Sequence, residues 1–141
     1  MEDEYDLQRF VRAQAPVYGD AIDILRHGGM CTPYMDFIFP RLAGDGGGAA
    51  RGYAIASLDE ASAYLTVAVL GGRYRECAHA LLWFPGKSAE NLFGEVNARK
   101  LHSSLTLFAE ASNYEPLFSI MLDIWFDWRL DEETIARLGM A

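Results

Sequence analysis

The sequence has few cysteines, no long apolar run and a shortage of basic residues. It has 141 residues and only two cysteines, Cys31 and Cys77, too few for the disulfide framework of many small secreted domains. No apolar stretch approaches the ~20 residues of a membrane-spanning helix, and the acidic start at residues 1–4 is unlike a signal peptide. We therefore expect a cytoplasmic protein that keeps its thiols reduced and is not inserted into a membrane.

The shortage of basic residues excludes two classes of partner. Lys and Arg number 12 against 20 Asp and Glu, which gives a formal net charge of −8. Nucleic acids and anionic membrane surfaces bind to basic footprints, so we expect neither as a partner. The negative charge lies at the two ends, in residues 1–6 and 115–141, whereas residues 7–114 are neutral. A local cationic site for a small anion is still compatible with this balance.

What the chain does contain is a series of helix signals. Hydrophobic residues make up 51% of the sequence, which is typical of a packed globular domain. Capping residues, prolines and glycines indicate where helices begin and end. The expected helices are one capped by Asp6 that runs through Gln14, one from Pro16 to the glycines at 28–29, Leu58–Leu65 behind Ser57, Arg73–Phe84, a short one from Ser88 to Gly94, Asn97–Ser112, Pro116–Phe126 and a last one from Asp131 to Gly139.

Two segments are ambiguous. Tyr34–Phe39 and Tyr53–Ala56 are rich in aromatic and β-forming residues, and each is compatible with a short strand or a buried helical turn. No other segment offers a sheet for them to join. We predict an all-α fold of about seven or eight helices, with one or two short extended segments at most. The whole chain, 1–141, is expected to form a single compact domain with an acidic N-terminal tail at residues 1–5.

No metal, cofactor or nucleophile motif is recognisable. The glycine-rich segment Gly44–Gly48 lacks the Gly-Lys-Ser/Thr sequence and the strand–loop–helix context of a phosphate loop. The three histidines, His27, His79 and His102, do not stand at zinc-ligand spacing from other ligands, and neither cysteine has a recognisable histidine partner nearby in the sequence. We expect no metal and no cofactor, and the sequence leaves open whether the protein is an enzyme.

The helix expected from Asn97 carries a candidate anion site. Lys100 and Ser104 stand one turn apart on the flank of its buried face, where a cation, a hydroxyl and free backbone N–H groups can hold an anion. A lysine lying along the surface and a small packing serine are the alternative. The opposite face is expected to be exposed to solvent, and it carries Arg99, His102, Ser103, Thr106 and Glu110.

A second group of candidate residues precedes the glycine-rich segment. Its aromatic rings, carboxylate and guanidinium can shape a ligand cleft, and core packing with a surface Asp–Arg contact is the alternative. With the helix from Asn97 it gives one hypothesis, a cleft for a small anionic metabolite in which Arg41 and Lys100 hold the charge and Tyr34 stacks. The candidate binding residues are Tyr34, Asp36, Phe39, Arg41, Lys100 and Ser104.

Aromatic residues near helix ends give a second hypothesis. Trp83, Trp125 and Trp128 exceed what the expected buried faces can cover, and exposed tryptophans are typical of interaction surfaces. The helix Pro116–Phe126 has only a narrow polar stripe, so it lies either in the centre of the core or half-covered by a partner subunit. The protein is then an interaction module or a homodimer without catalytic activity.

Several stretches of the sequence resemble a known family. They run from Asp6 to Leu138 and include Phe37–Pro40 and Leu101–Phe108. In this order they resemble a bacterial family known as domain of unknown function 1810. The resemblance implies a small, mostly helical, cytoplasmic bacterial protein, and it implies no particular activity.

The departures from the family pattern fall on the candidate site. Lys100 and Ser104 match a lysine and a serine of the family, whereas Tyr34, Asp36 and Arg41 replace residues of its His-Trp-x-Trp and Phe-Ile-Phe-Pro-Gln motifs. The resemblance therefore implies that this member has either a changed ligand or none.

Overall fold

Helices make up almost all of the regular structure in the computed structural model, which describes residues 3–44, 52–83 and 88–139. These residues form nine α-helices, one 3-10 helix and no strand, which confirms the predicted all-α fold in a compact domain. The elements are α1 (Gln8–Gln14), α2 (Tyr18–Arg26), η1 (Thr32–Tyr34), α3 (Met35–Ile38), α4 (Leu58–Thr66), α5 (Ala68–Leu81), α6 (Ala89–Phe93), α7 (Glu95–Ala111), α8 (Pro116–Phe126) and α9 (Glu132–Arg137).

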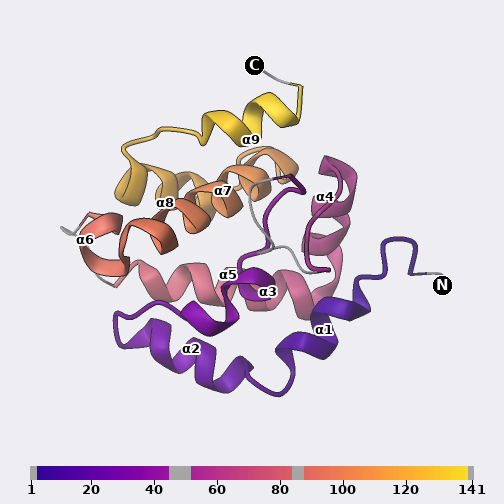
Figure 1. Ribbon diagram of the computed structural model, residues 1–141, viewed down its shortest axis with the longest axis horizontal. Helices are drawn as coiled ribbons and strands as arrows, with labels where there is room; N and C mark the ends of the chain where they lie inside the picture. Colours follow the sequence, from indigo (N-terminus) through magenta and orange to yellow (C-terminus); the bar gives the residue numbers. More distant parts are fainter. Residues whose placement is uncertain (1–2, 45–51, 84–87, 140–141) are drawn as a thin grey trace.

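The long helix α7 lies in the centre of the molecule. It packs against α4, α6, α8 and α9, while α5 packs against α2, α4 and α8. Figure 1 shows α1 and α2 along one edge and α9 along the opposite edge, with α5 and α7 between them. Because α7 is covered on several sides, every residue from Ser103 to Ala109 is buried.

An aromatic cluster forms the core between α4, α5 and α7. The Tyr74 ring lies 4.4 Å from the Phe108 ring, and the Tyr64 ring lies 5.2 Å from Phe108, measured between centroids. Both phenol hydroxyls are hydrogen-bonded, because Gln14 Nε2 donates to Tyr64 at 2.9 Å and Tyr74 pairs with the Ser104 hydroxyl at 2.8 Å. The cluster thus buries large apolar rings without leaving their polar groups unpaired.

Side-chain caps begin three helices as the sequence predicts. Ser57, Ser88 and Asp131 accept hydrogen bonds from the backbone N–H groups at 60, 91 and 134, at 3.1, 3.0 and 3.2 Å. Each cap satisfies a backbone donor that has no partner inside its helix. Pro116 stands in the first turn of α8, also as predicted.

Two predicted caps are wrong. Asp6 has a left-handed backbone with φ of 50°, and Asp3 instead accepts the N–H groups of Leu7 and Gln8 at 2.7 and 2.9 Å. Asn97 lies inside α7, which begins at Glu95, directly after a glycine. Its side chain donates to Thr32 Oγ1 and to the carbonyl of residue 93. It therefore does not cap the backbone N–H groups at the start of α7.

The start of α5 also differs from the prediction. The helix begins at Ala68 and ends at Leu81, whereas the sequence predicts Arg73–Phe84, and Phe84 lies outside the described residues. The glycine pair at 71–72 is a helix-breaking signal, but both glycines lie inside the helix. At Gly71 the neighbouring helix α4 comes close enough to exclude a side chain.

The two ambiguous segments take different conformations. Tyr34–Phe39 is helical up to Ile38, through the end of η1 and α3, and Phe39 directly follows the helix, which adds to the predicted number of helices. Tyr53–Ala56 is not helical, and within it Ile55 forms an isolated parallel bridge with Leu42. Of the glycine-rich segment only Gly44 is described, and residues 45–48 lie outside the described residues, as do residues 1–2 of the predicted acidic tail.

A helix that crosses a lipid bilayer needs about 20 predominantly apolar residues. None of the helices within 3–44, 52–83 and 88–139 combines the length and the apolar character needed to cross one.

Candidate functional site

Three of the predicted site residues meet on one carboxylate oxygen. Arg41 Nη2 donates to Asp36 Oδ1 at 3.3 Å, and Lys100 Nζ lies 3.9 Å from the same oxygen. We call Asp36, Arg41 and Lys100 the charge cluster. Their side chains are 28, 11 and 25% exposed, so the three charges are partly removed from water. Charge interactions are stronger at such a position than on the open surface.

Each member of the charge cluster comes from a different segment. Asp36 lies on α3, Lys100 lies on α7, and Arg41 lies on the chain that leaves α3. The Arg41 carbonyl accepts the N–H of Ile55 at 2.9 Å, which fixes this chain beside residues 53–56. Asn97 holds η1 to α7 through Thr32 at 2.9 Å, less than one turn before Lys100. The backbone around the cluster is therefore fixed from several directions.

Of the other three candidate residues, two lie in the core. Tyr34 is part-buried on η1, with its ring 6.2 Å from that of Phe37. Phe39 is fully buried with its ring 5.5 Å from that of Tyr74, and Ser104 is buried and bonded to the Tyr74 hydroxyl. Both therefore belong to the aromatic core, and the structure supports the packing alternative for Ser104.

The face of α7 that the sequence predicts to be exposed is partly covered, so that expectation is wrong for Ser103 and Thr106. Asp131 Oδ2 accepts from the Ser103 hydroxyl at 2.9 Å and from the Thr134 hydroxyl at 2.6 Å. The backbone N–H of Asp131 donates to Thr106 Oγ1 at 2.9 Å. The start of α9 thus lies on α7 and buries these hydroxyls, which is a polar contact that periodicity alone does not reveal.

Comparisons with known proteins place the chain in a family. The sequence pattern of the proteins of unknown function termed DUF1810 matches residues 4–138. The chain belongs to the DUF1810 family. Its structure is similar to the crystal structure of the conserved hypothetical protein Rv1873 from Mycobacterium tuberculosis, with a TM-score of 0.92 and 41% identity over 99% of this chain and 100% of that one. A comparison with curated proteins gives no match.

Both cysteines of this DUF1810 protein are buried thiols. Cys31 and Cys77 are free, and burial raises the pKa of each to about 12. Because the thiolate is the reactive form, neither group is suited to act as a nucleophile near neutral pH. We expect no reaction of the native protein with Ellman's reagent at pH 8, and reaction of two thiols per chain after unfolding in guanidinium chloride. Rapid labelling of a native thiol would contradict this prediction.

The histidines have structural partners or lie on the surface. The His102 ring stacks on Phe126 at 4.2 Å, and its Nε2 lies 2.6 Å from the Arg129 carbonyl oxygen. His27 and His79 are exposed. Within the part of the chain that the structure describes, no group of three or more His, Cys, Asp and Glu side chains is arranged to hold a metal ion.

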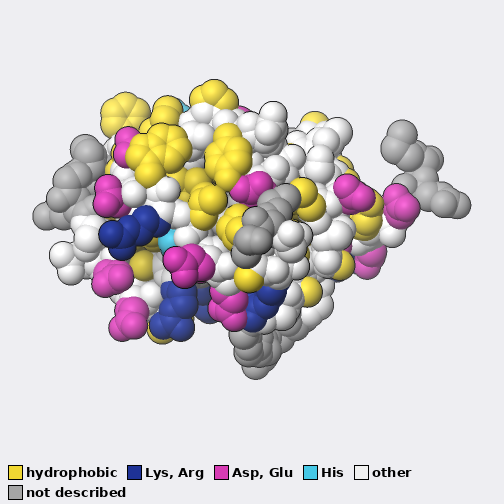
Figure 2. Space-filling model, turned by 90° about the horizontal axis from the view of Figure 1, so that it is seen from above, with side chains coloured by type: hydrophobic (Ala, Val, Ile, Leu, Met, Phe, Trp, Pro, Cys, Tyr) yellow, Lys and Arg dark blue, Asp and Glu magenta, His cyan; other side chains and the backbone are white. Residues whose placement is uncertain are grey.

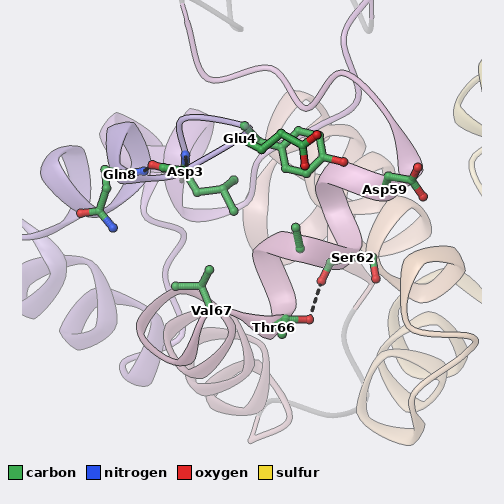
Figure 3. A pocket seen from close by; sticks show the side chains of 10 residues that line it. Asp3, Glu4, Gln8, Asp59, Ser62, Thr66 and Val67 are labelled. Atoms are coloured by element: carbon green, nitrogen blue, oxygen red, sulfur yellow. Dashed lines mark hydrogen bonds between the residues drawn. The ribbon is translucent and has the colours of Figure 1, made fainter. Parts of the chain in front are cut away.

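An acidic cavity lies between the N-terminal segment and α4 (Figure 3). Its volume is about 670 Å³, and its described lining has three carboxylates and no basic residue. Hydrogen bonds from Gln8 and Leu7 hold the pKa of Asp3 below its usual value, so this carboxylate is ionised near neutral pH. Such a lining disfavours anions. The lining residues are Asp3, Glu4, Tyr5, Leu7, Gln8, Asp59, Ser62, Ala63, Thr66 and Val67.

Two of the three tryptophans are exposed. Trp83 and Trp128 are 72 and 55% exposed, whereas Trp125 is 5% exposed and packs on Phe93 at 5.1 Å between ring centroids. Trp125 therefore lies in the core and not on the aromatic surface that the sequence predicts. Figure 2 shows one face of the molecule, on which hydrophobic side chains gather beside acidic ones. Large exposed apolar residues that gather in this way are typical of interaction surfaces.

Proposed function

We propose that the protein binds a small anionic metabolite at the charge cluster. The observation that supports this proposal is the approach of Arg41 and Lys100, from different segments, to the same oxygen of Asp36. A phosphate or carboxylate group can take the place of that oxygen, because guanidinium and ammonium groups donate several hydrogen bonds to such anions. Tyr34, at the end of η1, is the aromatic ring proposed to stack on the rest of the ligand.

Asp36 has a definite role in this proposal. Its carboxylate offsets one of the two positive charges when no ligand is bound, and a bound anion has to compete with it. Neither buried thiol forms a disulfide in the described structure, which is compatible with the bacterial cytoplasm that we propose as the compartment. No side chain is assigned a catalytic role.

The proposal is tested by binding measurements on three variants. We expect inorganic phosphate, pyrophosphate, sugar phosphates or dicarboxylates to raise the melting temperature of the wild type, and isothermal titration then gives the affinity. Lys100→Ala should weaken the best of these ligands by about tenfold, because it removes a charged hydrogen-bond donor. Asp36→Asn should tighten binding by about tenfold, because the competing carboxylate is gone.

Arg99→Ala is the matched control. Arg99 neighbours Lys100 on α7, but its side chain is 68% exposed and pairs with Glu95 one turn away. Its loss should leave the affinity unchanged. The proposal fails if none of these anions shifts the melting temperature, or if Lys100→Ala and Arg99→Ala weaken binding equally.

A second candidate function is that of a protein-interaction module. It is supported by the exposure of Trp128 and of two isoleucines on the preceding helix, Ile120 and Ile124. Light scattering on the purified protein tests the homodimer version of this function. A strict monomer at high concentration excludes the homodimer and leaves binding to a different protein as the form to test.

A further inference from the structure

The outward face of α8 carries large apolar side chains in a regular pattern. Ile120 and Ile124, one turn apart on α8, are 47 and 38% exposed, and the exposed Trp128 follows beyond the end of the helix. Residues spaced by four form one ridge along a helix, and ridges of this kind pack into the grooves of a second helix. We call Ile120 and Ile124 the apolar ridge.

Carboxylates lie beside the apolar ridge. Asp123 and Asp127 are exposed. Asp123 stands on α8 three residues after Ile120, and Asp127 directly follows the last residue of the helix. Among the described residues neither carboxylate has an ion pair or a side-chain hydrogen bond. The surface therefore combines apolar area with two carboxylates that form no ion pair with a described residue.

The rest of the helix is held firmly in place. Phe118, Met121, Leu122 and Trp125 are buried on its inner face. At its start, Arg75 donates two hydrogen bonds to the Glu115 carboxylate, at 2.8 and 2.9 Å. A surface fixed before binding loses little conformational entropy on association, which favours recognition.

We infer that this face of α8 docks a basic amphipathic helix of another protein. The inference rests on the second candidate function and names the partner's chemistry. Apolar side chains of the partner would pack against the apolar ridge, and its Lys and Arg side chains would pair with Asp123 and Asp127. Opposite charges at the edge of an interface speed association and select the partner.

The same charges disfavour a second copy of this chain as the occupant. In a two-fold dimer the same patch meets itself, so Asp123 and Asp127 would approach their equivalents on the other copy. Like charges that face each other across an interface are unfavourable, and the nearest basic residue in the sequence, Arg129, lies beyond the end of α8.

The test uses synthetic peptides and the full-length protein. The probes are a fluorescent amphipathic helix of Leu and Lys, a Leu/Glu helix with the same apolar face, and a scrambled Leu/Lys peptide that has no apolar face. We expect the protein to bind the amphipathic Leu/Lys peptide in fluorescence anisotropy at least about tenfold more tightly than either of the others. Salt should weaken this binding.

Substitutions on and next to α8 test whether the peptide binds at this face. The double variant Ile120→Ser/Ile124→Ser should weaken binding by about tenfold or more, because the buried apolar area is lost. The variant Asp123→Lys/Asp127→Lys should reverse the preference, so that the Leu/Glu peptide binds better. Val69→Ser and Asp20→Asn are controls, because they change an exposed apolar residue of α5 and an exposed acid of α2. Circular dichroism verifies the fold of every variant.

The possible negative results distinguish an error in the partner's chemistry from an error in the interaction function. If the Leu/Glu or scrambled peptide binds as well as the basic helix, or if sedimentation shows a dimer that Ile124→Ser dissociates, the inferred partner is wrong while the interaction function survives. If no peptide binds and the protein is monomeric, both the inference and the interaction function at this face are overturned.

Discussion

Replacing Gly71 by alanine is expected to destabilise the protein by about 3 kcal/mol, although alanine is the better helix former. A Cβ atom at this position would lie 2.1 Å from the Leu65 carbonyl oxygen and 2.7 Å from Arg75 Nη1. The oxygen belongs to the backbone of α4, so it cannot turn aside as a flexible side chain can. The two helices would have to separate, and α4 and α5 would lose part of their contact with the core.

Gly72 is the control for this prediction. It is the next residue of the same helix and is exposed, and a Cβ atom added there would meet nothing within 4 Å beyond its own helix backbone and chain neighbours. Gly72→Ala should therefore stabilise the protein by about 0.5–1 kcal/mol through lower entropy of the unfolded chain and better helix propensity. Urea denaturation measures both free energies of unfolding. Equal effects of the two substitutions would show that the contact at Gly71 does not limit packing.

Glu60→Gln is expected to lower the free energy of unfolding by about 3 kcal/mol. The Glu60 side chain is 5% exposed and accepts from Arg9 Nη2 at 2.8 Å and from the Ala56 N–H at 3.0 Å. Arg9 also donates to the carbonyls of Gly52 and Ala54, at 2.7 and 2.8 Å. Glutamine keeps the size but removes the negative charge, so a largely buried guanidinium loses its counter-ion.

An exposed ion pair is the control for Glu60. Glu95 and Arg99 are 3.6 Å apart on α7, with both side chains mostly exposed, and such pairs contribute little to stability. Glu95→Gln should change the free energy of unfolding by less than about 0.5 kcal/mol. If Glu60→Gln costs no more than Glu95→Gln in chemical denaturation, the Arg9–Glu60 pair does not hold α1 to α4.

Local signals account for most of the helix boundaries that the sequence predicts correctly. Ser57, Ser88 and Asp131 each cap the helix that follows, and Pro116 begins α8, because the chemistry of these positions involves only nearby backbone groups. The cap of α1 is predicted at the wrong residue. Three acids precede that helix within the described chain, and the choice of Asp3 depends on the turn that the backbone makes at Asp6.

The glycines of α5 show why local signals are insufficient. The sequence predicts a helix that begins at Arg73, directly after the pair at 71–72, and glycines weaken helix propensity. In the structure the helix continues through both, because Gly71 lets α4 and α5 approach closely. The gain comes from a contact between two helices, and the pattern of one helix contains no information about it.

The sequence predicts only part of the candidate site, because the rest also depends on contacts between helices. Charged side chains that cannot be buried alone gather with their counter-ions, so Asp36, Arg41 and Lys100 meet in the fold. Ser104 stands one turn after Lys100, yet it bonds the hydroxyl of Tyr74 in the core. The sequence does not show which phenol needs a partner, because that depends on how α5 packs against α7.

The contact between α9 and α7 fixes more than the position of one short helix. Thr134 is the buried residue of α9, and its hydroxyl bonds to Asp131, which also bonds Ser103 and Thr106. Apolar contacts tolerate sliding by part of a turn, whereas these directional hydrogen bonds fit a single register. The register places Arg137, at the end of α9, beside Gly44, which lies in the same loop as Arg41. The polar residues of α7 thus determine where a cation of the C-terminal helix meets the loop of the charge cluster.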